Sequence, residues 1–193
     1  GVIFFNFVNN LFFSLNLKEK PILFRISLAP PFSKEKTTFP DDKASKTVRG
    51  KWSIIDVQIK ISDNMMVKSQ IHHHPNGAFS YKVLSNDKAI SYITDCEYIS
   101  GNINEKLINF AKNSDLIIHD SHFTKEDLPS HKGWGHSSWD QAVLMTQKSN
   151  SKQLALYHYS PDYTDTQIKK IESDAQKIFK QTIAAKQGLV IYL

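Results

Sequence analysis

The sequence predicts an α/β or α+β sandwich, in which a sheet rich in hairpins carries helices on its outer face. Short runs of alternating or β-branched apolar residues recur between residues 54 and 95, as strands require. The C-terminal part alternates strand and helix patterns, and this unit places helices against a sheet. The hydrophobic content of 40% is enough to build a core.

The first half of the pattern is a series of hairpins. Residues 55–61 alternate apolar and polar side chains, which is typical of a half-buried strand. MMVKSQIHH and AFSYKVL follow as strands, and the Pro-Asn-Gly turn between them (residues 75–77) is a hairpin signal. KAISYIT is a further strand that leads to Asp95. Residues 29–50 are rich in Pro, Ser, Thr and charge, and we expect a long loop there.

The second half alternates helices and strands. Periodicity predicts, in order, a helix over 104–114, a buried strand over 115–120, a helix over 138–147 and a strand over 153–159. Thr164 and Gln167 form a capping-box pattern that opens a long amphipathic helix. Gly188 is expected to end that helix, and LVIYL closes the chain as a strand.

Composition narrows the function classes. The net charge of +5 favours anionic partners only weakly. The single cysteine, Cys96, excludes an internal disulfide and a cysteine-rich zinc knuckle, and fits a reducing, cytoplasmic setting. Residues 1–17 are apolar but interrupted by Asn and Ser, so they are too short and polar to span a bilayer, and we expect no membrane partner.

Polar side chains gather where the predicted strands end. His74 and Asp95 follow two strands, Asp120 and His158 follow two more, and His136 lies in the turn GWGHSS before a helix. Ligands bind at such strand ends, and neutral imidazole with carboxylate is a typical donor set for zinc or iron. No HExxH, CxxC or P-loop occurs, so the residues alone leave a metal site and ordinary structural histidines as equal alternatives.

Four segments resemble, in the same order, those of metallo-β-lactamase-fold hydrolases. HHHPNGAFSYKVLSNDKAISYITDCEY resembles the region that supplies a ligand histidine, a hairpin and a bridging aspartate. DLIIHDSHFT resembles the next strand, GWGHSS the Gly-His-Ser-Ser/Thr motif of the phosphodiesterase and transfer-RNA 3′-processing branches, and LALYHYSPDYTD the last-ligand strand. The resemblance covers residues 50–193. It implies a metallo-β-lactamase-like αββα sandwich, with residues 1–193 as a single domain that is N-terminally incomplete.

The resemblance also implies a role for each site residue. His74 would be the third histidine of a first metal, Asp95 would bridge two metals, and His158 would bind the second. His136 would act near the scissile phosphate as a proton donor or oxyanion contact. Asp120 would orient His136 or another histidine. The cofactor would be zinc, two ions in the complete protein, although these donors also suit iron and manganese.

Other candidate residues receive less prominent roles. His119 is expected to be a buried strand residue, whereas His122 and His131 are expected in loops or on the substrate side. Cys96 is expected to pack in the core. His72 shares the strand face of His74 and remains a minor alternative ligand.

One expected signature is missing. The sequence contains no His-x-His-x-Asp-His string, which in the family precedes an apolar helix that residues 1–13 resemble. The chain also begins with Gly, so we expect that it starts inside a domain; loss of the motif in a paralogue is the alternative.

The expected function is a metal-dependent hydrolase that uses metal-bound hydroxide, most simply a phosphodiesterase. Its partners would be a small-molecule or nucleotide phosphoester, with RNA also compatible, and a homodimer is left open. The alternative is a catalytically inactive metallo-β-lactamase-like binding module. A bare site made only of His74, Asp95 and His158 would be weak, since zinc takes four donors.

Overall fold

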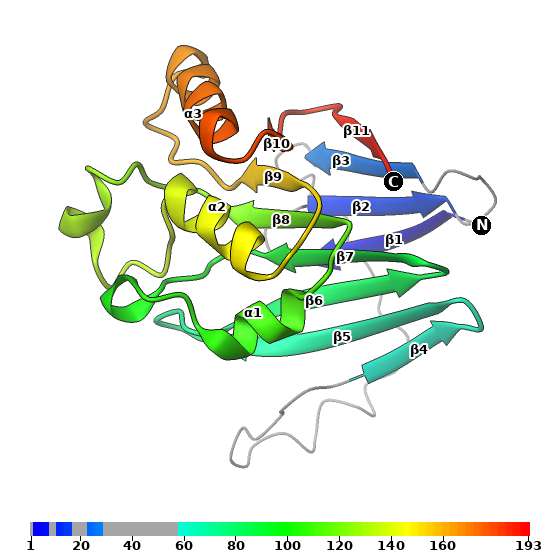
Figure 1. Ribbon diagram of the computed structural model, residues 1–193. Coiled ribbons are helices and arrows are strands. Elements are labelled where there is room, and N and C mark those ends of the chain that lie inside the picture. The colour runs from blue at the N-terminus through cyan, green and yellow to red at the C-terminus, as the bar shows by residue number, and fades with distance from the viewer. Residues whose placement is uncertain (1, 8–10, 17–22, 29–57) are drawn as a thin grey trace, which may run out of the picture. The chain divides into compact units, whose positions relative to one another are not determined.

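The computed structural model describes residues 2–7, 11–16, 23–28 and 58–193, and Figure 1 shows their helices and strands. The chain divides into two compact units, one formed by residues 1–55 and 187–192 and the other by residues 56–186 with Leu193. The single domain expected over residues 1–193 stays a prediction. No helix in the described ranges is long and apolar enough to cross a membrane.

The first unit contains a four-stranded antiparallel sheet in the order β1-β2-β3-β11. Its strands are β1 (Val2–Phe7), β2 (Leu11–Asn16), β3 (Leu23–Leu28) and β11 (Val190–Tyr192). The strand expected at LVIYL is confirmed. The helix that the resemblance implied over residues 1–13 is wrong, because aromatic and β-branched residues such as Ile3 and Phe13 favour strands, and β1 pairs with β2.

Within the described residues, the second unit contains a seven-stranded mixed sheet in the order β10-β9-β8-β7-β6-β5-β4. Its strands are β4 (Gln58–Ser62), β5 (Met65–His72), β6 (Ala78–Ser85), β7 (Lys88–Ile93), β8 (Leu116–Asp120), β9 (Leu154–Tyr157) and β10 (Thr182–Ala184). The expected hairpins are confirmed, and Gly77 donates its N–H to the carbonyl of His74 at 2.9 Å in the turn between β5 and β6. The expected loop over 29–50 and residues 55–57 lie outside the described ranges.

In the part of the chain that the structure describes, three α-helices pack on this sheet, namely α1 (Glu105–Ala111), α2 (Trp139–Lys148) and α3 (Asp165–Ile178) (Figure 1). Two 3₁₀ turns lie at Ile99–Gly101 and Leu128–His131. The helices contribute side chains such as Leu107, Met145 and Ile171 to one buried cluster with Ile117 and Leu156 of the strands. This apolar layer holds the strands rigid, so side chains at their ends keep fixed positions.

The last helix is shorter than the sequence indicated. Its start is confirmed, because Thr164 Oγ1 accepts the amide of Gln167 (3.4 Å) and the Gln167 side chain accepts the amide of Thr164 (2.8 Å). Its end at Gly188 is wrong, because α3 stops at Ile178 and the chain then forms β10 parallel to β9. The β-branched Thr182 and its neighbour fit the open edge of β9, so sheet pairing outweighs helical periodicity there.

Candidate metal centre

Strand direction explains why distant polar residues meet. Strands β7, β8 and β9 are parallel, while β5 is antiparallel to β6 and β6 to β7. The four strands β5, β7, β8 and β9 therefore point the same way, and their carboxyl ends lie at one edge of the sheet. His74, Asp95, Asp120 and His158 lie at or just beyond these ends, as the sequence predicted.

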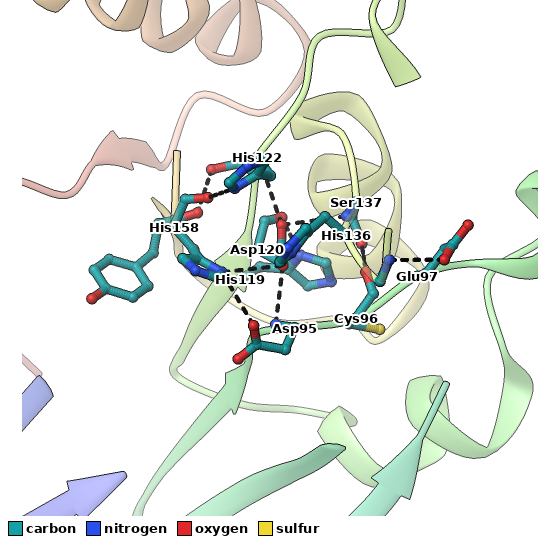
Figure 2. Close-up of polar contacts among 12 residues, drawn as sticks. Asp95, Cys96, Glu97, His119, Asp120, His122, His136, Ser137 and His158 are labelled. Atoms are coloured by element: carbon teal, nitrogen blue, oxygen red, sulfur yellow. Dashed lines mark hydrogen bonds and ion pairs between the residues drawn. The ribbon is translucent and has the colours of Figure 1, made fainter. Parts of the chain in front are cut away.

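Asp120 is the centre of the polar cluster and is fully buried (Figure 2). Its carboxylate accepts hydrogen bonds from His136 Nδ1 (2.9 Å), Asp95 N (3.0 Å), His122 N (3.1 Å), Ser137 N (3.3 Å) and His158 Nδ1 (3.4 Å). These donors come from segments far apart in the sequence. A single side chain at the end of β8 thus holds the ends of β7 and β9 and the GWGHSS turn together.

Electrostatics keep Asp120 ionised. Burial alone would raise the pKa of its carboxyl, but hydrogen bonds from His136 and His158 and their charges lower it well below the ordinary value. Burial lowers the pKa of His158, yet its hydrogen bond to Asp120 and the charges of Asp120 and Asp95 raise it overall. A buried carboxylate is tolerated here because its oxygens are hydrogen-bonded.

Hydrogen bonds also fix which ring nitrogens are available. His136 uses Nδ1 toward Asp120, so its Nε2 is the atom that can meet a substrate or ion. His122 lies parallel to His136, with ring centroids 4.2 Å apart, and its Nδ1 donates to the carbonyl of His158 at 2.9 Å. Its Nε2 is therefore available too.

Two overlapping groups of donor atoms are close enough to share an ion, with all atoms of each group within 4.8 Å of one another. One contains His74, Asp95 and His136, and the other contains His122, His136 and His158. The sequence predicts His122 in a loop or on the substrate side, and its membership of a donor group is a finding of the structure. Its place two residues after Asp120, where the chain turns back over the strand end, was the available signal.

The backbone is strained at two of these positions. Asp95 has φ 54° and His158 has φ 61°, both in the left-handed region that residues other than glycine rarely adopt. Such conformations persist where the surrounding structure imposes them, and they gather at functional sites. At both strand ends a polar group meets Asp120, namely the backbone amide of Asp95 and Nδ1 of His158.

The GWGHSS turn lies directly against His74. A Cβ added to Gly135, which has φ 91°, would lie 2.1 Å from Cδ2 of the His74 ring. Only glycine therefore fits there. The Ser137 hydroxyl donates to the carbonyl of Cys96, which ties the turn to the end of β7. His136 is thus held between two anchored neighbours.

The remaining candidates behave as buried groups. His119 is fully buried as expected, with Nε2 2.6 Å from the Tyr98 hydroxyl and Nδ1 2.6 Å from the carbonyl of Asp120. Cys96 packs in the core as expected, and burial raises the pKa of its thiol. Burial lowers the pKa of His72 to about 4, so its ring is neutral.

The donor chemistry fits a divalent metal ion. Imidazoles with a free Nε2, together with the carboxylate of Asp95, are the ligands that zinc, iron and manganese take in proteins. The sheet gathers such donors at its strand ends, and the molecule is therefore an α/β domain with a candidate metal centre. The chain belongs to the family described as the β-lactamase superfamily domain, which it matches over residues 38–159. The expected metallo-β-lactamase-like α/β fold class is thereby confirmed.

Comparisons with individual proteins support the same family assignment. Over 82 residues the chain is 38% identical to Ribonuclease Z of Thermoplasma acidophilum and 44% identical to that of Sulfurisphaera tokodaii. These matches cover 42% of this chain and only 26% and 27% of those proteins, so the chain spans about a quarter of their length. The structure of human tRNase Z, short form, superposes with a TM-score of 0.56 at 20% identity, over 70% of this chain and 45% of that one. That likeness shows the fold.

Proposed function

We propose that the chain belongs to a metal-dependent hydrolase that cleaves phosphodiester bonds. The observation that carries the proposal is that Asp95, His136 and His158 all bond to the buried carboxylate of Asp120, while His74 lies in one donor group with Asp95 and His136. The relatives named Ribonuclease Z support RNA or a nucleotide phosphoester as the substrate class. The mildly basic net charge of +5 is compatible with such an anion.

His74, Asp95 and His158 are the proposed metal ligands. Asp95 shares a donor group with His74, and its Oδ1 lies 3.8 Å from Nδ1 of His158, which supports a bridging place between two ions. We propose zinc, although iron and manganese accept the same donors. When bound, such an ion would lower the pKa of a water molecule and polarise the phosphoryl oxygen.

His136 and Asp120 are proposed as the catalytic pair. His136 presents Nε2 to the substrate, because Asp120 holds Nδ1 at 2.9 Å. With Nδ1 held in this way, a proton carried on Nε2 of His136 can be donated to the departing oxygen. Asp120 itself orients and stabilises the ring of His136, and it keeps its negative charge throughout.

The test is hydrolysis of an RNA phosphodiester by the purified zinc-loaded protein. We expect Asp95→Ala to abolish turnover, because the donor group of His74, Asp95 and His136 loses its only carboxylate. Asp63→Ala is the matched control, since Asp63 is exposed and pairs with the exposed Lys60 at 2.9 Å in the β4–β5 turn. Unchanged hydrolysis in Asp95→Ala would show that the bridging role is wrong.

A second candidate is a metallo-β-lactamase-like module that binds a ligand without turnover. It is favoured by one observation, namely that the sequence holds no His-x-His-x-Asp-His string. The hydrolysis assay, together with a filter-binding assay, separates the two candidates. If the chain is a binding module, it binds RNA on the filter, and neither the wild-type protein nor Asp95→Ala cleaves it.

Three broader assignments also stay proposals. The single buried cysteine supports a reducing, cytoplasmic setting, which fractionation would check. Residues 1–193 are proposed as one domain, to be checked by whether the chain unfolds in a single transition. A homodimer would be detected by analytical ultracentrifugation.

A further inference from the structure

Glu97 connects the two chain segments that carry Asp95 and His136. Its Oε1 accepts the amide of Gly133 at 2.7 Å, and its Oε2 accepts the amide of Gly135 at 3.0 Å. Glu97 follows Asp95 by two residues, and Gly135 immediately precedes His136. One carboxylate therefore fastens the turn that carries the proposed proton donor to the strand end that carries the proposed bridging ligand (Figure 2).

The chemistry of this contact requires a carboxylate. Each oxygen of Glu97 faces a different N–H, so both positions must be acceptors. A glutamine would turn an NH₂ group toward one of these amides. The side chain of Glu97 is only 12% exposed, and its charge-assisted bond to Gly135 is partly buried, whereas the bond to Gly133 lies at the surface.

Glu97 is itself fixed from a third direction. Its backbone amide donates to the carbonyl of His73 at 3.1 Å, beside the proposed ligand His74. The Nδ1 of His73 also lies 4.0 Å from Oε2 of Glu97. Glu97 thus relates three segments to one another, and each of them contributes a residue to the candidate metal centre.

We propose that Glu97 is a positioning residue that sets where Nε2 of His136 lies relative to the metal ligands. The inference rests on the proposed role of His136 as the proton donor. Loss of the Glu97 contact leaves other anchors in place, since the Ser137 hydroxyl still bonds to Cys96 and His136 still bonds to Asp120. The protein therefore still folds, but the turn moves more freely and proton donation slows.

The kinetic test compares Glu97→Gln with Glu126→Gln, a change at an exposed glutamate outside the site. Two substrates are used: an RNA, whose leaving alkoxide needs a proton, and a p-nitrophenyl phosphodiester, whose leaving group departs as a stable anion. We expect Glu97→Gln to lower kcat on RNA by about 10- to 100-fold with KM nearly unchanged, and to spare the p-nitrophenyl ester, because only proton donation is impaired. His136→Ala should show the same substrate pattern.

The possible outcomes separate the two proposals. If the wild-type protein cleaves both substrates and Glu97→Gln matches Glu126→Gln on each, the inference about Glu97 is wrong while the proposed function stands. Equal losses on both substrates would show a general structural role and would also overturn it. Absence of cleavage by the wild-type protein would count against the proposed function, and the inference would then be decided by the spectroscopic measurement.

Nuclear magnetic resonance tests the contact without turnover. We expect scalar couplings across the hydrogen bonds from the amide nitrogens of Gly133 and Gly135 to the carboxylate carbon of Glu97. In Glu97→Gln, amide exchange should increase at both glycines and the His136 ring should show greater motion, while Gly188 stays unchanged. Missing couplings, or a His136 ring that is equally ordered in the variant, would overturn the inference.

Discussion

Nδ1 of His136 lies 2.9 Å from Oδ2 of Asp120, and this pair connects the GWGHSS turn with the end of strand β8. The carboxylate is fully buried, whereas the imidazole side chain is 15% exposed. The pair therefore has one fixed, charged partner inside the protein and one partner that reaches toward solvent. This arrangement can orient a proton donor without exposing the group that orients it.

Replacing Asp120 with asparagine should impair both function and stability. The amide removes the negative charge and turns an NH₂ group toward N–H donors. We expect phosphodiester hydrolysis to fall by roughly 10²-fold or more, as for other orienting groups, and the free energy of unfolding to fall by about 3 kcal/mol. Hydrolysis rates and urea unfolding measure the two effects. Asp87→Asn, at an exposed turn, is the control, and a rate within twofold of wild type would contradict the orienting role.

Gly135→Ala should destabilise the protein more than Gly133→Ala. Both glycines have positive φ, 91° and 85°, so both substitutions strain the backbone. Only the Cβ at residue 135 would collide with the His74 ring, while residue 133 faces open space. We expect a difference of about 1–3 kcal/mol in the free energy of unfolding. Equal urea midpoints would mean that the turn does not pack on His74 as described.

Asp115 should stabilise the fold in a pH-dependent way. Burial raises the pKa of its carboxyl, but hydrogen bonds from Lys152 (2.7 Å) and the Ala89 amide (2.8 Å), together with the Lys152 and Lys88 charges, lower it overall. A carboxyl whose pKa is lower in the folded state stabilises the folded protein at pH values above its unfolded pKa, which is about 3.9. That contribution is lost as the pH falls through the pKa of the folded state.

Asp115→Asn should therefore destabilise the protein at neutral pH, and the difference from wild type should shrink as the pH falls below about 4. Urea unfolding between neutral and acidic pH measures this, with the exposed Asp87→Asn variant as a reference that shows little change. A deficit that stays constant with pH would rule out the linkage.

Cys96 should be chemically inert in the folded protein. It is 1% exposed, and burial raises the pKa of its thiol, so the reactive thiolate is scarce. A disulfide reagent such as dithiobisnitrobenzoate should react with one thiol per chain only in denaturant, because the chain has one cysteine. Prompt reaction in native buffer would contradict the packing described for this residue.

The sequence contained enough information to predict the convergence of the site, but not its details. Alternation and turn signals identified the strands that end near Asp95 and His158, and parallel strand order then brings such ends together. Glu97 and His122 escaped notice because their contacts depend on how loops fold over the strand ends, which periodicity does not encode. The end of α3 was missed for a related reason, since pairing with β9 is a tertiary effect.

The central claim is that divalent metal ions are held by His74 and Asp95 in one donor group and by His158 in the other. The most direct measurement is the zinc content per chain, by elemental analysis after equilibrium dialysis, of the wild-type protein, His158→Ala and His131→Ala. His131 is the control because it stacks on Phe123, with ring centroids 4.3 Å apart, and lies outside both donor groups. We predict that wild type and His131→Ala bind zinc and that His158→Ala loses most of it. Equal zinc content in all three proteins would contradict the claim.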